Sequence, residues 1–286
     1  MNGPLVATEW LAARLGDPGV RVVDVRWYLP TVGKQGRAEY GRGHLPGAVY
    51  VDLDTELAGP KGSGAGRHPL PAAEAFAAAM GRAGIGAGTG VVVYDDAGGS
   101  IAARLWWMLR YFGHEAVAVL DGGIGRWQAE GRPVETAVPA VATAVFRARP
   151  REGWVVDKQR VDALRRDATA LILDARAPER YEGRTEPVDP RAGHIPGARS
   201  APFARNLRDE EGARLKPAAE LRAQFEALGV PQAQAVVTYC GSGITACHNL
   251  LALQVAGFPN AQLYVGSWSD WSADAALPAA TGPEPG

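Results

Sequence analysis

Cysteine, long apolar runs and an excess of one charge are all scarce in this chain. The two cysteines, Cys240 and Cys247, lie seven residues apart and do not make the disulfide framework that stabilises small secreted proteins. No run approaches 18 consecutive apolar residues, so no transmembrane helix is expected. With 30 basic and 31 acidic residues, the formal net charge of −1 gives no bias toward nucleic acid or membrane surfaces.

The first residues also lack the pattern of a secretion signal. The stretch MNGPLVATEWLAARLGDPG has no basic region followed by a long apolar segment, and Asp17, Pro18 and Gly19 come too early for one. We therefore expect a cytoplasmic, monomeric protein in which both cysteines are thiols. The length of 286 residues, 47% of them hydrophobic, allows one large domain or two ordinary ones.

Several landmarks recur in the same order along the chain, as a duplication would produce. For example, His44 and His194 are 150 residues apart and lie in similar surroundings. A period of this size indicates two similar domains rather than a solenoid of small repeats. The similar segments are VRVVDVRW (20–27) with ALILDARA (170–177), GRGHLPGAVYVDL (41–53) with PRAGHIPGARSAPF (190–203), and GVVVYDDAGGSIAARL (90–105) with AVVTYCGSGITACHNL (235–250).

Each copy alternates short apolar strands with helical segments. The strand candidates VRVVDV, GVVVYD and AVAVLD of the first copy are matched by ALILDA, AVVTYC and AQLYVG of the second. This alternation predicts an α/β fold with a mainly parallel central sheet flanked by helices in each copy. The stretch 132–153 has several prolines and no clean period. We predict domains at 1–135 and 154–286, joined by a linker at 136–153.

The duplication also separates structural from functional candidates. A residue present in both copies is expected to serve the fold, whereas one present in a single copy is the better candidate for function. Cys240 is unique, because Asp95 stands at the matching place in the first copy. We therefore predict an inactive first domain and a catalytic second domain. The duplicated residues, expected to form carboxylate–arginine pairs and turn-anchoring histidines, are Asp24 and Asp174, Arg26 and Arg176, and His44 and His194.

Cys240 ends a predicted strand and precedes a glycine-rich loop and a helix. Ligands of open α/β sheets bind at the carboxyl ends of the strands. The N–H groups of the loop, assisted by the helix dipole, would form a nest that stabilises a thiolate or a thiolate carrying an additional sulfur. The alternative for Cys240 is a buried packing cysteine before an ordinary turn. We expect Cys247, which lies in the helix after the loop, to be a core residue. The loop residues are Gly241, Ser242, Gly243, Ile244 and Thr245.

These features together resemble the rhodanese superfamily of sulfurtransferases. The resemblance covers residues 5–280 and rests on the two-domain repeat, the CGSGITA loop, the paired GHLPGA and GHIPGA segments and the final GSWSDW segment. It implies two tandem rhodanese-like domains. The loop is similar to C-G-S-G-[VI]-T of the mercaptopyruvate-using branch. The thiosulfate-preferring branch usually has basic residues after the cysteine, where this chain has Gly241 and Ser242.

A mercaptopyruvate donor carries a carboxylate, for which arginine is a suitable forked hydrogen-bond donor. Arg180 matches the family's substrate-binding arginine and is unique to the second copy, since Pro30 stands at the matching place in the first. The family has a second carboxylate-binding arginine a little downstream. Either Arg184 or Arg191 fits that position, and the sequence leaves the choice open.

The resemblance also implies a triad. In the mercaptopyruvate-using branch, a loop serine pairs with a histidine and an aspartate of the first domain. These match Ser242, His68 and Asp52. A hydroxyl, an imidazole and an orienting carboxylate can move the proton of the thiol or protonate a departing enolate.

The expected reaction is a double displacement. Cys240 takes sulfur from 3-mercaptopyruvate as a persulfide and passes it to cyanide, a thiol or thioredoxin, with no organic cofactor or metal. Two alternatives stay open. One is a thiosulfate sulfurtransferase. The other, from a different class, is a persulfide-relay or redox-sensing binding module with little turnover on small molecules.

Overall fold

The computed structural model describes residues 3–62, 66–208 and 213–286 of the chain. They form two compact units. Unit 1 contains the described residues within 1–59, 71–151 and 208–215, and unit 2 contains those within 60–70, 152–207 and 216–286. The segment 60–70 therefore belongs with the second half of the chain, although it lies in the first half of the sequence. None of the helices in the described ranges has the length and apolarity needed to cross a membrane.

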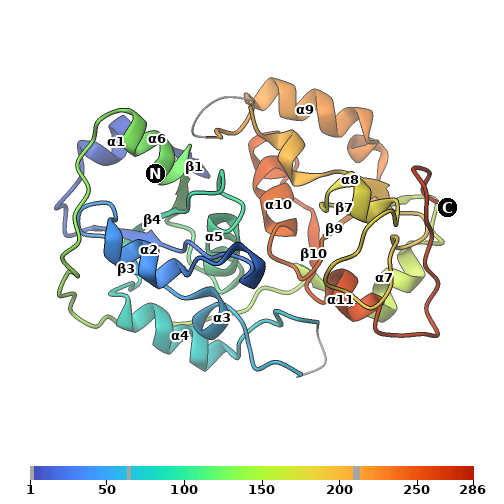
Figure 1. Ribbon diagram of the computed structural model, residues 1–286, viewed down its shortest axis with the longest axis horizontal. Helices are drawn as coiled ribbons and strands as arrows, with labels where there is room; N and C mark the ends of the chain where they lie inside the picture. Colours follow the sequence, from blue (N-terminus) through green and yellow to red (C-terminus); the bar gives the residue numbers. More distant parts are fainter. Residues whose placement is uncertain (1–2, 63–65, 209–212) are drawn as a thin grey trace. The chain divides into compact units, whose positions relative to one another are not determined.

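Unit 1 alternates strands and helices, as its sequence predicts (Figure 1). Its described elements are β1 (Leu5–Val6), α1 (Thr8–Ala12), β2 (Val20–Asp24), the 3-10 helix Pro30–Val32, α2 (Gly36–Arg42), β3 (Val49–Tyr50), α3 (Leu53–Glu56), α4 (Ala73–Arg82), β4 (Gly90–Tyr94), α5 (Ala102–Tyr111), β5 (Val117–Leu120) and α6 (Gly123–Ala129).

Unit 2 repeats this order with few changes. Its described elements are β6 (Val155–Val156), α7 (Lys158–Leu164), β7 (Ala170–Asp174), α8 (Pro178–Tyr181), β8 (Arg199–Ser200), the 3-10 helices Phe203–Asn206 and Val230–Gln232, α9 (Ala218–Ala227), β9 (Ala235–Tyr239), α10 (Ala246–Val255), β10 (Gln262–Tyr264) and α11 (Ser267–Trp271).

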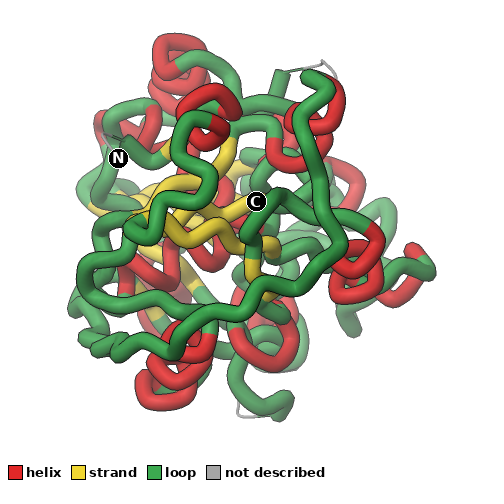
Figure 2. Tube along the Cα trace, turned by 90° about the vertical axis from the view of Figure 1, so that its left-hand side faces the viewer, coloured by secondary structure: helices red, strands yellow, loops and turns green. Residues whose placement is uncertain are grey.

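Both sheets have five strands in the same order. Unit 1 has β1-β5-β4-β2-β3 and unit 2 has β6-β10-β9-β7-β8, and the paired strands are parallel. The central strands are short apolar runs, as expected for strands covered on both faces by helices. Figure 2 shows strands lying between helices. The predicted α/β fold with a parallel central sheet in each copy is confirmed.

Helix α10 follows the glycine-rich loop and fixes its position. Every residue from Ala246 to Leu253 is buried. A helix that is apolar on nearly all sides is stable only inside the protein, and α10 contacts β9 and β10 as well as α9 (Figure 1). The loop 240–245 is therefore held between a central strand and a buried helix.

The duplicated polar residues have the structural roles expected of them. Arg26 binds both carboxylate oxygens of Asp24 in unit 1, and the matching pair in unit 2 has the same geometry. His194 Nδ1 lies 2.8 Å from the carbonyl oxygen of Tyr181, and the two rings stack at 3.8 Å. These contacts join each strand end to the loop that precedes the next strand.

Candidate active site

Cys240 follows the carboxyl end of β9 and is 2% exposed. Its backbone N–H donates to Ser267 Oγ at 3.1 Å, and its carbonyl accepts the N–H of Trp268 at 2.9 Å. Both partners belong to α11, which comes from the tryptophan-rich GSWSDW segment. This segment therefore fixes the backbone of the cysteine.

The loop closes around the sulfur. The N–H of Gly243 donates to Cys240 Sγ at 3.1 Å. Gly243 has a φ of +79°, and a Cβ atom there would lie only 2.6 Å from the carbonyl oxygen of Val265. Both observations require glycine, since other residues rarely adopt this conformation and no side chain fits. The geometry thus aims a backbone donor at the sulfur, which favours a negative charge on it.

The matching loop of unit 1 binds a side-chain carboxylate through its backbone N–H groups. There, the carboxylate of Asp95 is fully buried at the end of β4. Four backbone N–H groups donate to its two oxygens at 2.8–2.9 Å. The two loops follow equivalent strands, so the first copy keeps a fixed carboxylate where the second has a thiol. The donors of Asp95 belong to Ala97, Gly99, Ile101 and Ala102.

Ser242 and His68 are brought together within unit 2. His68 Nδ1 lies 2.8 Å from Ser242 Oγ, and both residues are 7% exposed. His68 lies in the segment 60–70, which packs with unit 2. A hydroxyl and an imidazole in contact can exchange a proton. The third member of the expected triad, Asp52, is described within unit 1, where its carboxylate caps α3 by accepting the N–H of Thr55 at 3.0 Å.

Arg180 lies beside the glycine-rich loop. One edge of its guanidinium binds acidic groups: Nη2 is 2.7 Å from Glu186 Oε1 and 3.0 Å from Asp189 Oδ2. Its other edge faces the loop, because a Cβ atom on Gly241 would lie 3.4 Å from Arg180 Nη1. An anion bound next to Cys240 would therefore meet this edge of the arginine.

A buried ion pair holds the acidic group that binds Arg180. Arg176 binds the carboxylate of Asp174, and its Nη1 lies 3.3 Å from Glu186 Oε2. Burial acts to lower the pKa of Arg176, but the nearby Asp174 more than offsets it, so this pKa is raised. Arg176 stays charged and holds Glu186, which in turn binds Arg180. The duplicated pair therefore also positions a residue that is unique to the second copy.

The other two arginines that the sequence proposes are engaged elsewhere. Arg184 is 58% exposed, and its Nε lies 2.6 Å from Glu182 Oε2. Arg191 donates to four backbone carbonyls, so four of its five N–H donors are already used. The accepting carbonyls are those of Trp271, Ser272, Asp274 and Leu277. Arg191 fixes the chain after α11.

The sequence reasoning missed Arg67, which comes next to His68. A Cβ atom on Gly241 would lie 3.0 Å from Arg67 Nη2. Arg67 also forms an ion pair with Asp189, and its N–H donates to Ser269 Oγ at 3.1 Å. Its neighbour His68 was a signal that could have revealed it, since a segment that brings one side chain to the site can bring the adjacent one too.

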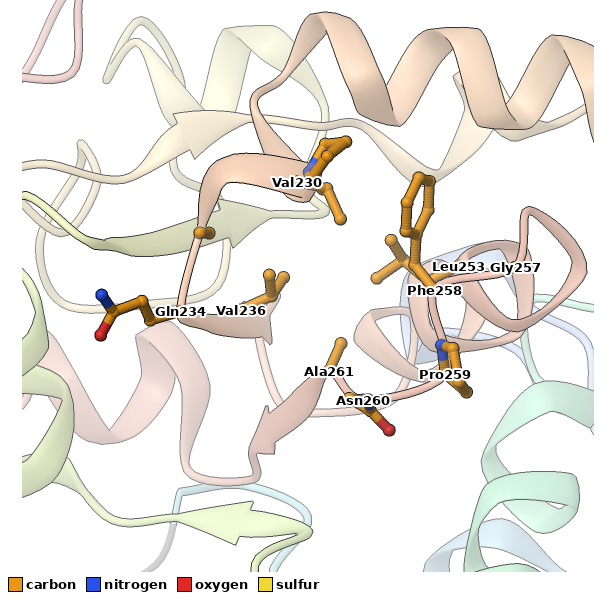
Figure 3. A pocket seen from close by; sticks show the side chains of 11 residues that line it. Val230, Gln234, Val236, Leu253, Gly257, Phe258, Pro259, Asn260 and Ala261 are labelled. Carbon is orange, nitrogen blue, oxygen red and sulfur yellow. The ribbon is translucent and has the colours of Figure 1, made fainter.

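The remaining cysteine and the hollow in unit 2 lie outside this constellation. Cys247 is fully buried in α10, as expected of a core residue, and its Sγ lies 3.3 Å from the carbonyl oxygen of Gly243. A hollow in unit 2 has a volume of about 410 Å³. Figure 3 shows residues that line it, such as Val236 and Phe258. Val236 lies near the amino end of β9, whereas Cys240 follows the carboxyl end, so the hollow is separate from the sulfur.

Comparison with known proteins agrees with this architecture. The model of the rhodanese-like domain matches residues 7–130 and 157–274. A Pseudomonas aeruginosa protein named "Probable 3-mercaptopyruvate sulfurtransferase" is 41% identical over 98% of this chain and 99% of its own length. The Arabidopsis thaliana protein named thiosulfate/3-mercaptopyruvate sulfurtransferase 2 is 36% identical over 97% of this chain and 86% of its own length.

A solved structure gives the same result. The crystal structure of SseA from Escherichia coli, described as a 3-mercaptopyruvate sulfotransferase with the rhodanese fold, has a TM-score of 0.82 and 35% sequence identity. The match covers 94% of this chain and 100% of that one. Since both copies match the domain model and near full-length relatives share the architecture, the chain belongs to the family of proteins built from rhodanese-like domains.

Proposed function

We propose that this chain is a sulfurtransferase that takes sulfur from 3-mercaptopyruvate through a persulfide on Cys240 and passes it to a thiophilic acceptor. The observation that carries this proposal is the N–H of Gly243 donating to the sulfur at 3.1 Å inside a loop whose counterpart holds a buried carboxylate. The names of the relatives, which are sulfurtransferases, support the same activity.

The donor binds with its carboxylate on the loop-facing edge of Arg180. A charge-assisted hydrogen bond of this kind fixes the donor and is stronger than a neutral one. Glu186 and Asp189 hold the guanidinium, so little side-chain entropy is lost when the donor arrives. The sulfur of the donor then lies next to the sulfur of Cys240.

The first half-reaction transfers one sulfur atom. The Cys240 thiol gives its proton to the Ser242–His68 pair, and the thiolate attacks the sulfur of mercaptopyruvate. A sulfur–sulfur bond forms, and the carbon–sulfur bond breaks with its electron pair on carbon. The resulting enolate takes the proton back from Ser242 and His68 and becomes pyruvate. The enzyme keeps a Cys240 persulfide, stabilised by the N–H groups of the loop.

The second half-reaction regenerates the thiolate. A nucleophile such as cyanide, a thiol or a thioredoxin-type protein attacks the outer sulfur, and the Cys240 thiolate leaves. Both steps use only side chains and backbone N–H groups named here. A reducing compartment such as the cytoplasm suits this cycle, because it keeps the cysteines as thiols and supplies thiol acceptors.

Thiosulfate is the second candidate donor. The loop itself has no basic residue, but Arg67 brings a guanidinium to the position where a side chain of residue 241 would begin. A dianionic donor would be attracted to this charge. The Arabidopsis relative carries both donors in its name. Sulfite would then leave in place of the enolate, and it needs no proton.

Steady-state turnover with each donor, with cyanide as acceptor, tests the proposed function. We expect a higher kcat/KM for 3-mercaptopyruvate than for thiosulfate. A preference for thiosulfate would make the second candidate the better description. If neither donor turns over while intact mass shows stable loading of sulfur on the protein, the chain is a persulfide-relay module instead.

Ser242→Ala should separate the two chemistries. Loss of a proton-transfer group typically lowers turnover by roughly 100-fold or more, so we expect such a loss of kcat with mercaptopyruvate. The loss with thiosulfate should be much smaller, because sulfite leaves without protonation. The measurement is kcat for both donors in the variant and the wild type.

Two further variants serve as controls. Ser100→Ala removes a buried serine from the matching loop of unit 1 and should leave kcat unchanged with both donors. The His68→Asn, Ser242→Ala double variant should lose little more than either single variant, since residues that act as a unit are not additive. Equal losses with both donors would argue against proton transfer by this pair.

The same assay on Asp52→Asn checks the orienting role predicted for Asp52.

A further inference from the structure

Two guanidinium groups converge on the backbone next to the nucleophile. A Cβ atom placed on Gly241 would lie 3.0 Å from Arg67 Nη2 and 3.4 Å from Arg180 Nη1. Both arginines therefore border the space left open by this glycine. They come from segments more than 100 residues apart in the sequence, and both segments belong to unit 2.

A single carboxylate orders both groups. Asp189 binds Arg67 through one oxygen and Arg180 through the other, and its side chain is only 2% exposed. Its own backbone N–H donates to Glu186 Oε1 at 3.0 Å, which fixes the turn that carries it. Each arginine thus binds an acid with one edge and turns another N–H edge toward Gly241.

The charge of this arrangement replaces charge that the loop lacks. From Cys240 to Ala246 the loop contains no lysine or arginine. A side chain at position 241 would compete for the space in which Arg67 Nη2 lies, because the two would be only 3.0 Å apart. Glycine at this position therefore leaves room for a guanidinium supplied by another segment.

We infer that Arg67 is the second anion-binding residue of the site and a determinant of donor choice, forming with Arg180 a clamp whose two forks are held by Asp189. This inference rests on the proposed function and deepens it. The clamp would bind the carboxylate of an α-keto acid donor or the sulfonate end of thiosulfate, since both are planar or trigonal oxygen anions suited to forked donors.

The charge of each donor decides how strongly its binding depends on Arg67. The attraction between a fixed cation and an anion is proportional to the charge of the anion. Thiosulfate carries two negative charges and the mercaptopyruvate carboxylate carries one. Loss of Arg67 should therefore weaken the binding of thiosulfate more than that of mercaptopyruvate. The ratio of their kcat/KM values should shift accordingly.

A purely positioning role is the competing explanation. Arg67 precedes His68, and its ion pair with Asp189 helps to hold the segment that brings His68 to Ser242. If positioning were its whole role, removing it would lower kcat with mercaptopyruvate through loss of the His68–Ser242 contact, shift the donor ratio toward thiosulfate, and leave KM and anion binding unchanged. An anion-binding residue instead raises KM, shifts the donor ratio away from thiosulfate and weakens binding of unreactive anions.

Arg67→Met tests the inference, with Arg67→Lys as the conservative variant and Arg166→Met as the matched control. Arg166 is also paired with an aspartate, but it lies just after α7 and is 63% exposed. A hydrogen bond to a charged group corresponds to a change of roughly 10- to 100-fold. We expect Arg67→Met to lower kcat/KM by about 10-fold for mercaptopyruvate and about 100-fold for thiosulfate, mainly through KM. Arg67→Lys should recover part of both.

Calorimetric titration with sulfate and with pyruvate gives a readout that does not need turnover. The Kd of both anions should rise about 10-fold in Arg67→Met and stay at the wild-type value in Arg166→Met. An unchanged donor ratio together with unchanged anion binding would overturn the inference. If the wild type turns over neither donor, the proposed function fails by itself, and the titrations still decide whether Arg67 binds anions.

Discussion

Cys240→Ser should abolish sulfur transfer from both donors. A serine hydroxyl has nearly the same size, so the N–H of Gly243 keeps an acceptor and the loop keeps its shape. The hydroxyl is a far weaker nucleophile and cannot form a persulfide. Removing the nucleophile of a catalytic unit typically costs more than about 1,000-fold in kcat. Steady-state turnover with each donor measures this loss.

Intact mass identifies the sulfur carrier directly. After incubation with donor and no acceptor, the wild type should gain the mass of one sulfur atom, and Cys240→Ser should gain none. Cys247→Ser is the matched control, since Cys247 is fully buried and its replacement can still donate to the carbonyl of Gly243. This variant should still be loaded with sulfur. Loading of Cys240→Ser but not of Cys247→Ser would place the nucleophile at Cys247.

The fold could be predicted because its signals are local and repeated. Short runs such as GVVVY and AVVTY each predict a buried strand, and the recurrence of the pattern in both copies supports each prediction. A strand, a glycine-rich loop and a helix in sequence are enough to place Cys240 at a strand end. Asp95 then becomes informative, because the duplication identifies it as the counterpart of the cysteine.

The site was harder to predict because part of it depends on long-range packing. The segment 60–70 interrupts unit 1 in sequence but packs with unit 2, and no local pattern of hydrophobicity records this. Arg67, for which we propose a role in the site, was therefore not predicted from the sequence. Arg191 lies near the expected position in sequence, but its guanidinium fits a cluster of carbonyls after α11. Spacing along the chain cannot tell a carbonyl-binding arginine from a substrate-binding one.

The loops that follow β4 and β9 hold different side chains at matching places. In unit 1 the buried carboxylate of Asp95 accepts hydrogen bonds from the N–H groups of the loop. In unit 2 a glycine-rich loop without basic or acidic residues surrounds the Cys240 thiol, and the N–H of Gly243 donates to its sulfur. In the function that we propose, this donor stabilises the charge that forms on sulfur during the reaction.

The second large effect concerns stability, and the duplication supplies its control. Arg176→Met leaves the fully buried carboxylate of Asp174 without its partner and removes the contact with Glu186. Breaking a buried ion pair from one side costs about 3–5 kcal/mol. We expect a loss of this size in the free energy of unfolding, measured by urea denaturation. Arg176 also lies 4.7 Å from the ring centre of Trp268.

Two comparisons make this result specific to the ion pair. The Asp174→Asn, Arg176→Met double variant should recover part of the lost stability, because no uncompensated charge remains buried. Arg26→Met breaks the matching pair in unit 1 and should leave the KM for the donor nearer that of the wild type, because Arg176 is the residue that holds Glu186. Since Arg176 also holds Glu186, and Glu186 holds Arg180, a folded Arg176→Met protein should in addition show a raised KM for the donor. A stability loss below about 1 kcal/mol, the size typical of an exposed pair, would mean that Asp174 finds other partners and that the duplicated pair is dispensable.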